Sequence, residues 1–251
     1  MPHSPSPFPS QPPSPSHSPA RPLPPTRPPR HWTPAAPPRH ALAAGTALIL
    51  LSLAIGLILR LDERPFFQGL DDAWARSMDG SPGDPATGFA TVLDRLGGPL
   101  GTILPLMLMG CLCMYGRWRS ALFVFTTAIA GSMLVVLPLK QVADRPRPPY
   151  TWVLVNDGSY PSGQVFSAVA LVMAVAVVLF PPGAARRWWW LFGAGYTAAM
   201  MWSRTWLHAQ WLTDTVGGAL AAAGACLLLW RAFAPLLETE AQRKAADTLW
   251  M

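Results

Sequence analysis

The chain has 251 residues, a net charge of +6 at neutral pH and hydrophobic side chains at 51% of its positions. Only 13% of its residues are charged, about half the share that is usual in a soluble globular domain. Its basic residues lie in short groups between apolar runs, as membrane topology requires, so the positive charge does not indicate a nucleic-acid partner. The three cysteines lie inside apolar runs and predict neither a metal site nor a disulfide framework.

Residues 1–39 hold 16 of the 29 prolines and no acidic residue. Such a segment cannot bury enough apolar surface to fold, and proline removes backbone donors. We therefore predict a disordered, basic cytoplasmic tail. Its Pro-rich sequence leaves open a protein partner of the SH3 kind.

Six apolar runs follow the tail, each at or near the roughly 20 residues that a helix needs to cross the hydrocarbon core. They cover residues 41–60, 98–115, 119–139, 164–180, 188–203 and 213–234. We therefore predict an all-α fold, a six-span transmembrane helical bundle within residues 40–235, followed by a short cytoplasmic tail over residues 236–251. After the first run, Asp71 and Asp72 predict a short amphipathic segment on the outer face.

The lysines and arginines of the short loops predict the orientation. They place both termini in the cytoplasm, at the plasma (inner) membrane, and the loops 140–163 and 204–212 outside. Lys140, Arg145 and Arg147 are exceptions, because three cations lie on the side that is otherwise poor in basic residues. A bound anion is the natural reason for such cations.

The two outer loops contain a set of residues suited to phosphate. Lys140 offers a point charge, and Arg147 and Arg204 offer planar forks that match phosphate oxygens. Ser162 and Gly163, at the start of the fourth run, would add a hydroxyl and the free N–H groups of a helix N-terminus. The two loops therefore predict one anion site at the outer face.

The spacing of these residues resembles the signature of the type 2 phosphatidic acid phosphatase superfamily, which is Lys-x6-Arg-Pro, Pro-Ser-Gly-His and Ser-Arg-x5-His-x3-Asp. This sequence has Lys140-x6-Arg147-Pro148, Pro161-Ser162-Gly163-Gln164 and Ser203-Arg204-x5-Gln210-x3-Asp214. Integral-membrane members of that family dephosphorylate lipid phosphates and pyrophosphates in a six-helix bundle with its site at the outer face. The resemblance covers roughly residues 60–235. It implies an orienting role for Asp214 toward residue 210, and phosphate binding by Lys140, Arg147, Ser162, Gly163 and Arg204.

Two glutamines depart from that pattern. By the resemblance, position 210 is the nucleophilic histidine and position 164 is the histidine that protonates the leaving oxygen. Gln210 and Gln164 can neither form a useful phospho-intermediate nor shuttle a proton near neutral pH. His208 lies two residues before Gln210, which is about 200° around a helix and on the wrong face, although a loop could swing it in.

Three functions stay open at this point. The favoured one is a catalytically impaired member that binds membrane lipid phosphates through an intact phosphate-binding half. The second is an active phosphatase for phosphatidate or polyprenyl phosphates, working through His208 or water, or an inactivated variant of one. The third is an interaction protein whose working part is the tail. No cofactor and no metal is expected, because Asp144, Asp157 and Asp214 match no ligand spacing and are better explained as solvated or ion-paired.

Overall fold

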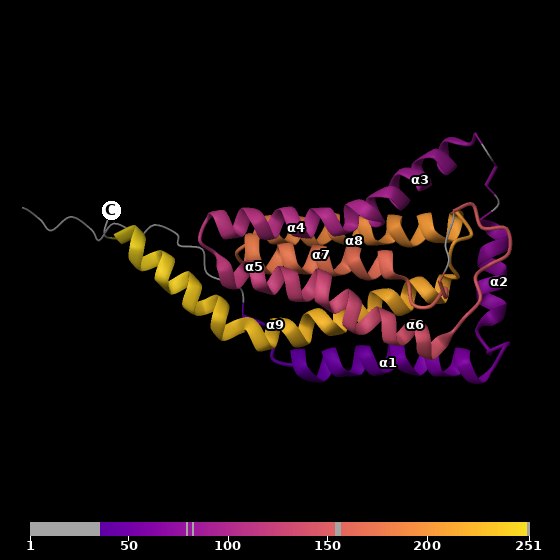
Figure 1. Ribbon diagram of the computed structural model, residues 1–251, viewed down its shortest axis with the longest axis horizontal. Helices are drawn as coiled ribbons and strands as arrows, with labels where there is room; N and C mark the ends of the chain where they lie inside the picture. The colour runs from indigo at the N-terminus through magenta and orange to yellow at the C-terminus, as the bar shows by residue number, and fades with distance from the viewer. Residues whose placement is uncertain (1–35, 79, 82, 154–156, 250–251) are drawn as a thin grey trace, which may run out of the picture. The chain divides into compact units, whose positions relative to one another are not determined.

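The computed structural model describes residues 36–78, 80–81, 83–153 and 157–249, so most of the predicted tail lies outside the described residues. The described part contains helices and no strand, which confirms the all-α class (Figure 1). The elements are α1 (Ala41–Leu61), α2 (Gln68–Ser77), α3 (Pro85–Gly97), α4 (Pro99–Met114), α5 (Trp118–Val124), two π-helical turns η1 (Phe125–Ala130) and η2 (Ser132–Val136), α6 (Leu137–Ala143), α7 (Gly163–Leu179), α8 (Ala184–Trp206) and α9 (Leu212–Leu249).

Each of the six apolar runs is helical, as expected of segments whose backbone polar groups must be satisfied internally in lipid. Three helical stretches in the described part are long and apolar enough to cross a membrane alone: Ala41–Leu61, Trp118–Ala143 and Leu212–Asp247. The pair α3 and α4, bent by 46°, would make a fourth. The apolar α7 is shorter, with 17 residues. The six-span count therefore stays a prediction.

Helix α7 lies among the other helices (Figure 1). Its side chains are buried along most of its length. It contacts α3, α4, α5, α8 and α9. Its sequence is rich in alanine, whose small side chain lets neighbouring helices approach closely, and in valine, which fills the space between them. Because α7 begins at the predicted phosphate motif, this packing holds the start of the helix in a fixed place.

The helices α1 and α9 pack closely through two glycines. A Cβ atom on Gly45 would lie 2.9 Å from the carbonyl oxygen of Gly224, and one on Gly224 would lie 2.7 Å from the carbonyl oxygen of Gly45. Any larger residue would force the two backbones apart, so these glycines set the helix separation. Helix α9 continues to Leu249, and the residues predicted as a C-terminal tail are therefore helical as far as the described part extends. Their Glu, Ala, Gln and Lys residues are good helix formers.

Two short helices lie between the first two apolar runs. The predicted amphipathic segment around Asp71 is α2. The sequence analysis did not predict α3, although its start has clear signals: Asp84 caps the helix by accepting a hydrogen bond from the backbone N–H of Ala86 at 3.1 Å, and Pro85 occupies the first turn. This helix supplies a carboxylate to the site.

Candidate functional site

The start of α7 is fixed against α9. Ser162 is fully buried, and its Oγ accepts a hydrogen bond from the N–H of Val165 at 3.3 Å, so it caps the helix. Its own N–H donates to the carbonyl oxygen of Asp214 at 3.0 Å. Gly163 is the first residue of α7. The serine and glycine of the predicted motif therefore stand at a helix N-terminus, as the sequence predicts.

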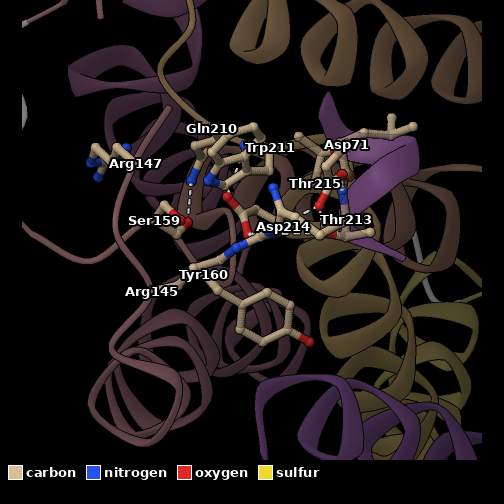
Figure 2. Close-up of polar contacts among 12 residues, drawn as sticks. Asp71, Arg145, Arg147, Ser159, Tyr160, Gln210, Trp211, Thr213, Asp214 and Thr215 are labelled. Carbon is tan, nitrogen blue, oxygen red and sulfur yellow. Dashed lines mark hydrogen bonds and ion pairs between the residues drawn. The ribbon is translucent and has the colours of Figure 1, made fainter. Parts of the chain in front are cut away.

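Gln210 lies in the loop between α8 and α9, with 4% of its surface exposed. Its amide nitrogen donates to the carbonyl oxygen of Ser159 at 2.9 Å (Figure 2). Its amide oxygen accepts from Nε of Arg204 at 3.2 Å. Both ends of the side chain are thus engaged, one with each of the two predicted loops.

Arg204 and Asp94 connect the two glutamines. Nη1 of Arg204 forms an ion pair with the Asp94 carboxylate on α3. The same carboxylate accepts a hydrogen bond from Nε2 of Gln164 at 3.1 Å. The result is a hydrogen-bonded chain, Gln210–Arg204–Asp94–Gln164, that joins the two positions where the family pattern has histidines. Oε1 of Gln164 is buried without a donor among the described residues.

Lys140 and Arg147 share one carboxylate, that of Asp157. Nζ of Lys140 lies 2.9 Å from one oxygen of Asp157, and Nη2 of Arg147 lies 2.5 Å from the other. Arg147 also donates to the carbonyl oxygens of Asp157 and Ala209, at 2.9 and 2.6 Å. The side chain of Asp157 is 58% exposed, whereas those of Lys140 and Arg147 are nearly buried. We call these three residues the Asp157 clasp.

The clasp gives these cations a partner within the protein. The sequence predicts a bound anion as the natural reason for the cations of the loop after α6, and the carboxylate of Asp157 also balances the charge of Lys140 and Arg147. Partial burial would raise the pKa of Asp157, yet hydrogen bonds and charges from Lys140 and Arg147 outweigh that effect and lower its pKa. Asp157 is therefore ionised at neutral pH, and Asp144 is likewise paired, with Arg60 at 3.1 Å.

Arg145, the third cation of the loop after α6, forms ion pairs with two aspartates. Its Nη2 lies 2.7 Å from Asp71 and its Nη1 lies 2.7 Å from Asp214, and both carboxylates are fully buried (Figure 2). The other oxygen of Asp214 accepts from the N–H of Trp211 at 2.8 Å. Within the described residues Asp214 makes no hydrogen bond to Gln210, so it fixes the backbone beside that residue instead of its side chain.

His208 is engaged elsewhere. Its Nε2 lies 2.9 Å from the carbonyl oxygen of Met78, just after α2. The residue has a positive φ of 49°, which fixes the turn that ends α8. A role for His208 in place of residue 210 would require breaking this contact.

The comparisons with known proteins agree with this geometry. Residues 121–237, which contain every motif residue, match the model of the PAP2 superfamily, the type 2 phosphatidic acid phosphatases. This stretch, a little under half of the chain, is similar to that superfamily. Its structure is similar to that of the first transmembrane PAP2 type phosphatidylglycerolphosphate phosphatase from Bacillus subtilis, with a TM-score of 0.61 and 20% identity over 77% of this chain and 96% of that one. No curated protein matches the chain.

At that identity, the likeness to the phosphatase from Bacillus subtilis establishes the fold alone. The helices that are long and apolar enough to cross a membrane indicate an integral membrane protein. Asp94 is the site residue that sequence reasoning missed. It is one acid among several in an acid-rich segment, and no spacing distinguishes it from its neighbours.

The Asp157 clasp predicts how the stability of the protein depends on pH. The pKa of Asp157 is lower in the folded chain than its ordinary value of 3.8, so the stabilisation is fully present above that value and is lost as the pH falls through the folded pKa. Because Asp157 is more than half exposed, we expect Asp157→Asn to cost at most about 1 kcal/mol of stability. The melting temperatures of the two proteins should differ by a constant amount between pH 5 and 7 and converge below roughly pH 4. A difference that grows on acidification would contradict this assignment.

Proposed function

We propose that this chain is a member of the PAP2 superfamily that binds the phosphate group of membrane lipid phosphates or pyrophosphates at the outer membrane face, and that its hydrolytic chemistry is impaired. The observation that supports the proposal best is the Gln210–Arg204–Asp94–Gln164 chain. This chain links Arg204 to residues 210 and 164, the two positions that would have to react in phosphate hydrolysis. Those two positions hold amides.

The argument for impaired catalysis rests on what an amide can do. A nucleophile in phosphoryl transfer needs an available lone pair, and a leaving-group acid needs a proton that it can give up near neutral pH. The nitrogen of Gln210 has neither, and it already donates to Ser159. Gln164 likewise donates to Asp94 and has no titratable group.

The argument for binding rests on the Asp157 clasp. A phosphate could replace the carboxylate of Asp157 on Lys140 and Arg147, because that carboxylate is the exposed member of the set. A phosphate has more charge and more acceptor oxygens than a carboxylate, and Arg147 would meet it with a planar fork. Asp157 would thus act as the resident anion that a ligand must displace.

The first test restores the chemistry. The chain as it stands should release little phosphate from phosphatidate or polyprenyl pyrophosphate, and so should Gln210→His alone, because the leaving-group acid is still missing. The double variant Gln164→His, Gln210→His should release phosphate clearly, since residues of one catalytic unit act together. Robust turnover by the unaltered chain, abolished by His208→Ala, would instead show an active phosphatase working through His208.

The second test concerns binding. Vanadate or a short-chain lipid phosphate should raise the melting temperature in detergent by mass action. Asp157→Asn should increase this shift, because the ligand no longer competes with a carboxylate for Lys140 and Arg147. The matched control is Asp144→Asn, which removes a more exposed carboxylate (72% against 58% for Asp157) that is paired with Arg60 outside the clasp. No shift at millimolar ligand, or equal shifts in both variants, would argue against the phosphate site.

The third test concerns orientation. If both termini are cytoplasmic, Tyr150, which is 90% exposed in the loop after α6, faces outward. In a background without Cys111, Cys113 and Cys226, a Tyr150→Cys variant should react with a membrane-impermeant thiol reagent in intact cells. A variant with Ala184→Cys, exposed at the start of α8, should not. The reverse labelling pattern would place the site on the cytoplasmic face.

A further inference from the structure

One face of α8 contains an apolar stripe with an arginine at each end. Spacings of three and four residues bring Arg186, Trp190, Thr197, Met201 and Arg204 onto the same side of the helix. The two arginines are separated by 18 residues, which is about 27 Å along a helix. That length is close to the hydrocarbon thickness of a bilayer, about 30 Å.

An apolar groove follows this stripe between α7 and α8. It has a volume of about 360 Å³ and is lined by Val169 and Val172 of α7 and by Ala194, Thr197 and Met201 of α8, among others. The hydroxyl of Thr197 is almost the only polar group among the lining side chains. Helices α7 and α8 approach closely at one point along the groove, where a Cβ atom on Gly193 would lie 2.2 Å from Cγ1 of Val172. Such a groove is suited to a hydrocarbon chain.

Arg186 lies at the end of the groove where α8 begins. Its surface is only 8% exposed. Its guanidinium lies over the ring of Trp190, at 5.9 Å, and over the ring of Trp230 from α9, at 5.3 Å. Trp190 is also a wall of the groove, so the cation and the groove are adjacent.

No carboxylate or carbonyl oxygen of the described residues accepts a hydrogen bond from Arg186. This distinguishes it from Arg145 and Arg204, which are as deeply buried and are each paired with an aspartate. A guanidinium has five N–H donors. The nitrogens of Arg186 are not among the buried unpartnered atoms of the described residues, so they reach the surface and are open to an anion. The two indole faces stabilise the cation but accept no hydrogen bond in the plane of the fork.

We propose that Arg186 and the α7–α8 groove form a lipid site at the start of α8, in which Arg186 binds the phosphate of an anionic phospholipid and one acyl chain lies in the groove. The phosphate is assigned to Arg186 because Arg204, at the other end of the stripe, already has Asp94 as its counter-charge. An apolar groove beside an uncompensated cation fits a molecule with a charged head and an apolar chain. The predicted phosphate-binding residues, which we call the phosphate cage, are Lys140, Arg147, Ser162, Gly163 and Arg204. Neither Arg186 nor any residue that lines the groove belongs to this cage, so the proposal stands independently of the proposed function.

The test uses the full chain, stripped of lipid in detergent and titrated with phosphatidylglycerol, phosphatidylcholine or inorganic phosphate. Native mass spectrometry counts bound lipids, and thermal unfolding measures stabilisation. We expect phosphatidylglycerol to bind and to raise the melting temperature, and inorganic phosphate not to displace it. Arg186→Gln should remove one bound lipid and weaken its binding at least about tenfold, as expected for the loss of a charged hydrogen-bonding group.

The matched control is Arg187→Gln, which removes the same charge from the exposed neighbouring position and should leave lipid binding unchanged. The vanadate response of the phosphate cage should also be unchanged in Arg186→Gln, which separates this site from the proposed function. Equal phosphatidylglycerol binding by the unaltered chain and by Arg186→Gln would overturn the proposal. So would displacement of the lipid by inorganic phosphate, because the cation would then bind a free anion.

A second pair of variants tests the groove, and it decides the question if Arg186→Gln does not fold. Ala194→Trp fills the groove from an exposed position. Gly195→Trp places the same bulk on the next residue, where an added side chain meets nothing within 4 Å. We expect only the Ala194→Trp variant to lose the lipid. Retention of the lipid by this variant would show that the groove does not hold the chain.

Discussion

The buried contact of Arg145 with Asp71 and Asp214 holds together the end of the molecule that contains the candidate site. Its guanidinium joins α2, the loop after α6 and the first turn of α9. Removing one member of such a set leaves a buried charge without its partner, which typically costs about 3–5 kcal/mol. Asp214 also fixes the backbone of Trp211 and, through its carbonyl oxygen, that of Ser162. The positions of both loops of the site therefore depend on this one cation.

The positive and negative charges of the phosphate cage do not balance. Lys140, Arg147 and Arg204 face two carboxylates, which leaves one net positive charge. Asp157 is 58% exposed and Asp94 only 21%. Displacing Asp157 would leave two positive charges, which match a phosphate dianion. Displacing Asp94 would break the chain that connects the two glutamines, so a ligand should enter through the Asp157 side.

The sequence predicts the helices and the motif residues better than it predicts the partners of those residues. Apolar runs are local signals, and a helix is the structure that satisfies a lipid-exposed backbone, so their positions follow from the sequence. The partners in an ion pair, by contrast, do not follow from local sequence. Arg145 pairs with residues 74 and 69 positions away, and which acid reaches it depends on how α2 and α9 pack. The same reason explains why Asp94 was missed: its neighbours in the acid-rich segment look equivalent until α3 places one of them beside Arg204.

The hydrogen bonds at positions 210 and 164 bear on whether histidines would fit there. Gln210 donates from one end and accepts at the other. A neutral imidazole also has one donor and one acceptor nitrogen, so in the resting state it can donate to Ser159 and accept from Arg204. A phosphate that takes over the N–H of Arg204 would free that lone pair for attack. Gln164 donates to Asp94 but leaves its oxygen buried without a donor. An imidazole there would keep the contact with Asp94 and remove the unpaired oxygen. The surroundings thus suit a histidine at both positions, which is why the double revertant tests the chemistry on a scaffold that needs no other change.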